Sequence, residues 1–213
     1  MSAIRTAYLE AAESAAAMLR DPAVAQAWDK PSALEEFSTG GLAAHLAAQL
    51  FNVQKALDAD RPAGEERIGL VEHYARATWV GADLDHETNV AIRGGGEQQA
   101  SRGTGTLLAQ LADSLAELRT ALPAEPGDRV VYLPWTGWAL ALDDFLVTRM
   151  MEIAVHSDDL AVSAGIDTPD LPAAVIEPVV DLLTRIAVRR HGQPAVLRAL
   201  SRAERAPDTI AAI

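Results

Sequence analysis

Cysteine is absent from all 213 residues of the chain. Its absence excludes disulfide bonds and thiolate metal ligands, so any thiol chemistry must use a thiol that a cosubstrate brings in. Hydrophobic residues make up 49% of the chain and charged residues 23%. This is an ordinary balance for a globular protein, and the length suffices for a sizeable core.

Positive charge is scarce, and the formal net charge is −12. Nucleic acid and anionic membranes would repel such a chain, so neither is expected as a partner. The N-terminus has no signal-peptide hydrophobic region. The uncharged run 37–54 contains His45, Gln49 and Asn52, and these polar residues argue against a membrane span there. We therefore expect a cytoplasmic protein.

Apolar residues recur with helical spacing through most of the chain. The helices expected from this pattern cover residues 3–19, 39–57, 65–84, 106–122, 142–165, 171–191 and 194–200. The sequence therefore predicts an all-α fold, a four-helix bundle with additional C-terminal helices. We expect residues 1–165 to form the bundle and residues 166–213 to form a helical extension packed on it.

Three segments between these helices are expected to be non-helical. Residues 23–36 are predicted to form a loop that returns Trp28 to the bundle. Residues 85–105 are rich in glycine and are predicted to form a flexible loop, since the Lys-Ser/Thr of a phosphate-binding loop does not follow. Residues 129–138 are expected to be extended or irregular, because Pro134 should prevent a regular strand.

The helix expected at 142–160 carries Arg149, Glu152 and His156 along its apolar side. Glu152 and His156 are one turn apart, so a carboxylate and an imidazole can reach one divalent ion. His45, on the apolar helix 39–57, is the best third donor. Structural interpretations exist for each signal, because a lone helix histidine is usually a hydrogen-bonded core residue and Glu-x3-His pairs also arise as helix salt bridges.

These residues form a recognisable pattern: a histidine in GLAAHLA, followed about a hundred residues later by R-x2-E-x3-H-x2-D in RMMEIAVHSDDLA. The pattern resembles the DinB-like metal-binding four-helix family, and within it the mycothiol-dependent maleylpyruvate isomerase N-terminal domain group. The Trp28-x2-Pro31-Ser32 stretch and the C-terminal tail are similar to this group as well. The resemblance implies that His45, Glu152 and His156 bind a divalent metal, for which we expect zinc.

The resemblance also implies mycothiol, or a similar low-molecular-weight thiol, as cosubstrate. The implied function is a divalent-metal-dependent thiol transferase or isomerase in which a metal-bound thiolate attacks a small-molecule electrophile. The isomerase carries a second domain after the bundle, whereas residues 166–213 resemble a helical extension, so a general thiol transferase is the safer expectation. A metal-dependent hydrolase and a non-catalytic metal- or small-molecule-binding bundle stay open, as does a homodimer.

Four more residues are candidates for roles around the metal. Arg149 could hold a negatively charged substrate group, or it could simply pair with Glu152. Trp135 and Trp138 could line the cosubstrate pocket or pack in the core. Asp159 could accept the second N–H of His156, although its place near the end of the helix slightly favours a surface position.

Overall fold

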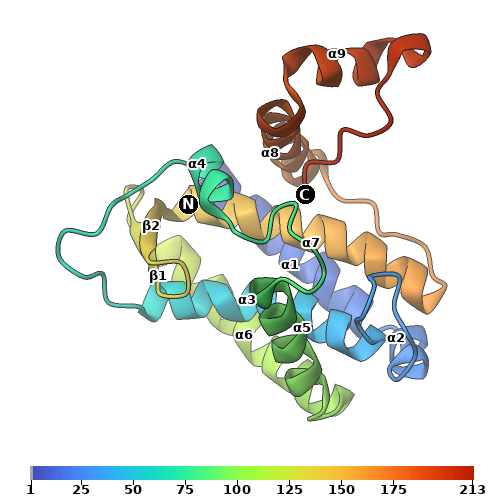
Figure 1. Cartoon of the computed structure of the whole chain (residues 1–213). Helices are drawn as coiled ribbons and strands as arrows, with labels where there is room; N and C mark the ends of the chain where they lie inside the picture. Colours follow the sequence, from blue (N-terminus) through green and yellow to red (C-terminus); the bar gives the residue numbers. More distant parts are fainter. Residues whose placement is uncertain (1) are drawn as a thin grey trace.

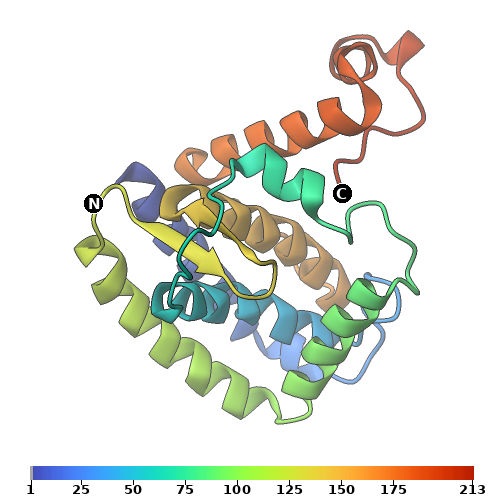
Figure 2. The same cartoon turned by 60° about the vertical axis from the view of Figure 1, so that its left-hand side comes forward.

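The computed structural model describes residues 2–213. Its centre is a bundle of long helices that run side by side (Figures 1 and 2). These helices are α1 (Ala3–Leu19), α3 (Thr39–Asp58), α6 (Thr104–Ala124) and α7 (Leu142–Ala164). Both α6 and α7 pack against α1 and α3. The predicted all-α bundle with additional C-terminal helices is confirmed.

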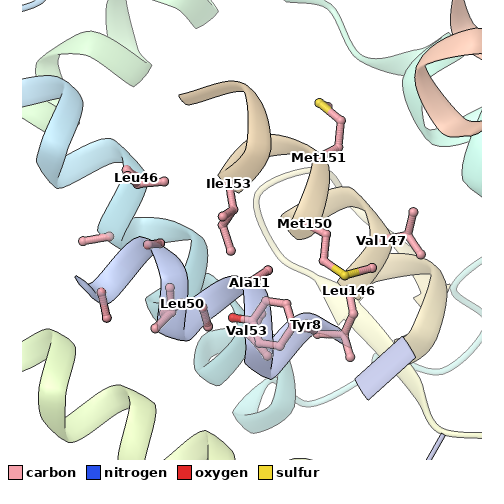
Figure 3. Close-up of a cluster of buried hydrophobic side chains, with 14 of the residues drawn as sticks. Tyr8, Ala11, Leu46, Leu50, Val53, Leu146, Val147, Met150, Met151 and Ile153 are labelled. Atoms are coloured by element: carbon pink, nitrogen blue, oxygen red, sulfur yellow. The ribbon is translucent and has the colours of Figure 1, made fainter. Parts of the chain in front are cut away.

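The bundle core forms where α1, α3 and α7 meet (Figure 3). Aliphatic side chains fill most of it, with Tyr8 of α1 among them, and the tyrosine hydroxyl donates a hydrogen bond to the backbone oxygen of Gln49 at 3.2 Å. The fully buried core residues in this region include Ala11, Leu46, Leu50, Val53, Leu146, Met150 and Ile153. Tight packing of this kind fixes the rotation of α3 and α7 about their axes, and therefore fixes which of their side chains face each other.

The two helices that carry the candidate ligands have defined ends. Ser38 caps α3, and its Oγ accepts a hydrogen bond from the backbone N–H of Gly41 at 2.9 Å. Gly165 ends α7 with a φ of 68°, in the left-handed region that favours glycine. These local signals explain why both helices match the ranges expected from sequence within a few residues.

Two expectations for the first half of the chain are wrong, those for residues 23–36 and 65–84. Residues 22–27 form a short helix, α2 (Pro22–Ala27), which Asp21 caps, instead of belonging wholly to a loop. The helix expected at 65–84 shrinks to α4 (Leu70–Arg76). Before α4, the backbone N–H of Ile68 donates to the oxygen of Ala139, and the N–H of Ala139 donates to the oxygen of Glu66, both at 2.9 Å. Residues 66–68 are therefore extended and cannot join the helix.

The glycine-rich segment is a helix, α5 (Glu87–Ala100), and the predicted flexible loop at 85–105 is wrong. Packing against α3 replaces the missing helix propensity. A Cβ atom added to Gly96 would lie 2.8 Å from the backbone oxygen of Gly41, so glycine permits the close approach of the two helices. Glu97 then accepts hydrogen bonds from the backbone N–H and the hydroxyl of Ser38, both at 2.8 Å.

Residues 129–141 contain a regular antiparallel hairpin, so the extended course expected there is right, but the expectation that Pro134 prevents a regular strand is wrong. Strand β1 (Val130–Leu133) pairs with β2 (Trp138–Ala141), with Leu133 opposite Trp138. Pro134 lies in the turn between the strands, where it needs no N–H partner. The expectation failed because it placed Pro134 within a strand.

The last elements are α8 (Ala173–His191), α9 (Gln193–Ser201) and a 3-10 turn, η1 (Ala203–Arg205). Helix α8 packs on α1, α4 and α7, and one of its faces joins the bundle core. Helix α9 packs mainly on α8 and stands away from the bundle in Figure 1. Nowhere in residues 2–213 is there a helix both long enough and apolar enough to cross a membrane.

Candidate metal centre

The structure brings His45, Glu152 and His156 together, as the sequence predicted. His45 projects from α3, and the other two project from successive turns of α7. One donor atom from each residue lies within 4.8 Å of the other two. The two imidazole rings meet edge to face, with their centroids 4.7 Å apart. Two helices far apart in sequence therefore direct three potential ligands to one point.

The charges in this cluster depend on its burial and its hydrogen bonds. Burial lowers the pKa of His45 to about 4, and the charge of His156 adds to this effect. Burial opposes ionisation of Glu152, but the hydrogen bond with His156 and the charge of Arg149 outweigh it and hold the pKa at about 2. At neutral pH, His45 is therefore neutral and Glu152 is an anion, the forms in which both residues bind metals.

His156 lies between two carboxylates. Its Nε2 is 3.1 Å from Oε2 of Glu152, and its Nδ1 is 3.0 Å from Oδ2 of Asp159. Burial alone would lower the pKa of His156, but these two hydrogen bonds raise it to about 9. The surface position that the sequence slightly favoured for Asp159 is wrong, since Asp159 is half-buried against the ring.

The donor set fits a divalent ion of the zinc type. Two imidazole nitrogens and one carboxylate oxygen are a common set for such ions, and three protein ligands leave a position open for a further group. Asp159 can accept the Nδ1–H of His156 and so leave the Nε2 lone pair for the ion, as carboxylates do for metal-bound histidines. The His45 ring contacts the rings of Phe37 and His156, and within residues 2–213 it forms no hydrogen bond. Its nitrogen is therefore free to act as a ligand.

Arg149 does not form the ion pair with Glu152 that its sequence spacing allows. Its guanidinium donates to Oε1 of Gln49 at 2.7 Å and to Oγ1 of Thr148 at 2.9 Å, and it lies over the Phe145 ring at 5.2 Å. These partners are all neutral. Within the described residues, the half-buried guanidinium has no carboxylate partner, so it can receive a carboxylate from a ligand. The role of Gln49 could not be recognised from its position in an apolar stripe.

The two tryptophans have different surroundings. Trp135 lies in the hairpin turn, is 47% exposed and contacts Phe145 with ring centroids 6.2 Å apart. Through Phe145 it is connected to the guanidinium of Arg149. Trp138 is half-buried, and its indole N–H donates to Nδ1 of His73 at 3.0 Å. Cosubstrate binding by Trp135 and Trp138 stays a prediction.

Helix α4 adds two buried polar residues to this side of the bundle. The first of these residues is His73, which is 6% exposed. Burial lowers the pKa of His73 to about 4, and the charge of Arg149 contributes. The Tyr74 hydroxyl is buried without a hydrogen-bond partner in the described chain, and burial together with the charge of Glu152 raises its pKa. The sequence holds no local signal for either environment, because the contacts come from distant segments.

A comparison with protein-family models matches residues 8–161 to the mycothiol maleylpyruvate isomerase N-terminal domain. The chain belongs to this family. The matched segment of this mycothiol maleylpyruvate isomerase N-terminal domain protein contains all three candidate ligands, Arg149 and the β-hairpin, and it ends before α8. Neither the curated proteins nor the solved structures yield a match. Membership supports a mycothiol-related, DinB-like domain.

Proposed function

We propose that the protein is a divalent-metal-dependent thiol transferase or isomerase that uses mycothiol or a similar low-molecular-weight thiol. The observation that carries the proposal is the convergence of His45, Glu152 and His156, with donor atoms within 4.8 Å of one another. Zinc is the ion we expect at this set of nitrogen and oxygen donors. A bound divalent ion would lower the pKa of an incoming thiol and so supply a thiolate at neutral pH.

The chain has no cysteine, so the reacting sulfur must come from the cosubstrate. In a transferase reaction, the thiol loses its proton, sulfur bonds to the electrophilic carbon, and the leaving group departs with its electron pair. In an isomerase reaction, sulfur adds to a carbon–carbon double bond, the resulting single bond rotates, and elimination releases the thiol again. Both reactions require that the thiol sulfur be held next to the electrophilic carbon.

The neighbouring side chains supply binding and orientation. Asp159 holds the His156 ring through Nδ1 at 3.0 Å. Arg149, with neutral partners only, is proposed to hold a carboxylate of the electrophile, and its bonds to Gln49 and Thr148 fix the direction of the guanidinium. Trp135 and Trp138 are proposed to line the side from which the thiol enters.

The proposal is tested with two matched electrophiles, 4-(bromomethyl)benzoate and its methyl ester, supplied with zinc-loaded protein and mycothiol. We expect mycothiol S-alkylation above the uncatalysed rate, faster with the carboxylate than with the ester. Substitution Arg149→Met should remove this preference, because the ester and the acid would then meet the same neutral site. Substitution Arg149→Lys is the matched control, since it keeps the charge.

Two results would contradict the proposal. Release of bromide that proceeds equally well without thiol would show that water is the nucleophile and the protein is a hydrolase. Stoichiometric zinc binding without turnover of any thiol and electrophile pair would indicate a non-catalytic binding protein.

A further inference from the structure

Helix α8 has apolar residues on two faces, and the bundle covers only one of them. The covered face consists of Val175, Val179, Leu182 and Ile186, all buried. On the opposite side, residues at four-residue intervals form a second stripe, which we call the outer stripe: Ile176, Val180, Thr184 and Val188. The apolar members of the outer stripe are 37%, 51% and 36% exposed. Apolar side chains lined up in this way are typical of a helix that packs on a further partner.

A row of charges runs beside the outer stripe, one residue further along the chain. In order these charges are Glu177, Asp181, Arg185 and Arg189, and all four residues are exposed. The N-terminal half of the row is therefore negative, and the C-terminal half is positive. The contact between Asp181 and Arg185 in the same helix is 3.6 Å long and largely exposed, so it contributes little and leaves both groups available.

This pattern is complementary to itself when the helix is reversed. Suppose that a second α8 crosses the first antiparallel near Leu182. Glu177 then meets the partner's Arg189, and Asp181 meets the partner's Arg185. A parallel crossing would place the two charge rows on opposite sides of the contact, where they could not pair. Apolar stripes flanked by charges determine partner and direction in this way in paired helices.

We propose that a second copy of this chain docks on the outer stripe of α8, antiparallel, to form a two-fold symmetric homodimer. A two-fold interface uses the same surface on both subunits, and the order of charges on α8 meets this requirement. Leu197 and Leu200 of α9, 56% and 69% exposed, supply further apolar surface next to α8. An anionic membrane is a poor alternative, since the chain carries a net charge of −12.

The first experiment is sedimentation velocity over a range of concentrations of the full chain. We expect a reversible dimer for the wild type. Substitution Val180→Glu, in the middle of the outer stripe, should raise the dissociation constant at least about tenfold, because it places an unpaired charge against apolar surface. Unchanged circular dichroism and metal content would show that this exposed position leaves the fold intact.

Charge exchange tests the direction of the helices. The variant Glu177→Arg/Asp181→Arg has only positive charges in the row, and Arg185→Glu/Arg189→Glu has only negative ones, so each should dimerise at least about tenfold more weakly than the wild type. An equimolar mixture of the two should form a heterodimer. The matched control combines all four substitutions, which keeps the net charge and reverses the row, and it should dimerise like the wild type.

Four results would overturn the proposal. A wild type that is monomeric at high-micromolar concentration would remove the second copy as the occupant. Dimerisation that persists in Val180→Glu would place the interface elsewhere. A four-substitution variant that stays monomeric would contradict the antiparallel arrangement, and binding of the wild type to anionic phospholipid vesicles through Val180 would assign the stripe to a membrane. None of these results depends on catalysis.

Discussion

Two charged clusters meet the buried side of α7, one at its start and one in its second half. At the start, the guanidinium of Arg5 is 2% exposed and pairs with Asp143 at 3.0 Å. It also donates to the backbone oxygens of Glu125 and Pro126 at 2.5 and 2.8 Å. The Arg5 guanidinium is therefore fully engaged with partners in the chain, and these contacts connect α1 to the end of α6.

The second cluster is less complete. His45 contributes a ring without a hydrogen bond in the described chain, and Arg149 has neutral partners only. Buried polar groups normally find partners, so an incomplete set at one place is a sign of a ligand site. The difference shows that buried charge alone does not mark a ligand site on α7. A site is marked by buried polar groups that have no charged or hydrogen-bonding partner within the chain.

Breaking the complete cluster should have the largest effect on stability. Substitution Arg5→Met leaves Asp143 and the carbonyl oxygens of Leu122, Glu125 and Pro126 without their partner. We expect a loss of about 3–5 kcal/mol in the free energy of unfolding, measured with urea. The exposed pair of Arg119 and Glu13 offers a control, for which Arg119→Met should cost less than about 1 kcal/mol. A change in metal content per folded Arg5→Met chain would contradict the separation of the two clusters.

The support that Asp159 gives to His156 can be removed without touching a ligand. Substitution Asp159→Ala should lower zinc affinity by about 10–100-fold, since the imidazole loses the hydrogen bond that fixes its tautomer. Isothermal titration with a competing chelator measures the change. Asp158→Ala, at the exposed neighbour, should leave the affinity as it is. Equal effects of both substitutions would argue that general charge near the site, not the hydrogen bond, matters.

Lowering the pH should reveal how much the buried histidines contribute to the stability of the fold. The folded pKa values of His45 and His73 are about 4, below the ordinary histidine value, so the unfolded chain binds protons first as the pH falls. The contribution of these two residues to the stability of the metal-free protein should be complete above about pH 6.5 and decline towards pH 4, by up to about 1.4 kcal/mol per pH unit for each histidine. His156, with a folded pKa of about 9, acts in the opposite direction, and its contribution should decline from about pH 6.5 towards pH 9. His73→Gln should reduce the acid-side slope in urea titrations. An unchanged slope would show that His73 is accessible to protons in the folded state.

The smallest expected effect concerns Arg149. Substitution Arg149→Met removes a charge that has no carboxylate in hydrogen-bond contact, but it leaves the buried Oε1 of Gln49 without its donor, so the free energy of unfolding should fall by about 1–2 kcal/mol. Urea unfolding measured beside Arg5→Met sharpens the contrast between the two arginines. A loss as large as that of Arg5→Met would assign Arg149 to the structure of the bundle.

The sequence predicted those features that depend on neighbours along the chain. The caps at Ser38 and Gly165, together with helical spacing, located α3 and α7. The spacing of Glu152 and His156 predicted their shared side of one helix. Helix α5 was missed, because its glycines are unfavourable for a helix by themselves. The contact with α3 explains Gly96, whereas Gly94 and Gly95 face open space.

The surroundings of the site could not be predicted, since they come from pairs distant in sequence. Gln49 meets Arg149 across two helices, and Trp138 meets His73 across the hairpin and α4. Neither pair has a local pattern. The hairpin itself was obscured by Pro134, whose position in a turn becomes evident only from the pairing of the strands on each side.

The central claim is that His45, Glu152 and His156 bind one divalent ion. Inductively coupled plasma mass spectrometry of purified wild type, His45→Ala and the control His191→Ala tests it most directly. We predict one divalent ion per chain in the wild type and in His191→Ala, and loss of stoichiometric metal in His45→Ala. A metal-free wild type, given zinc and then dialysed, or full metal content in His45→Ala, would contradict the claim.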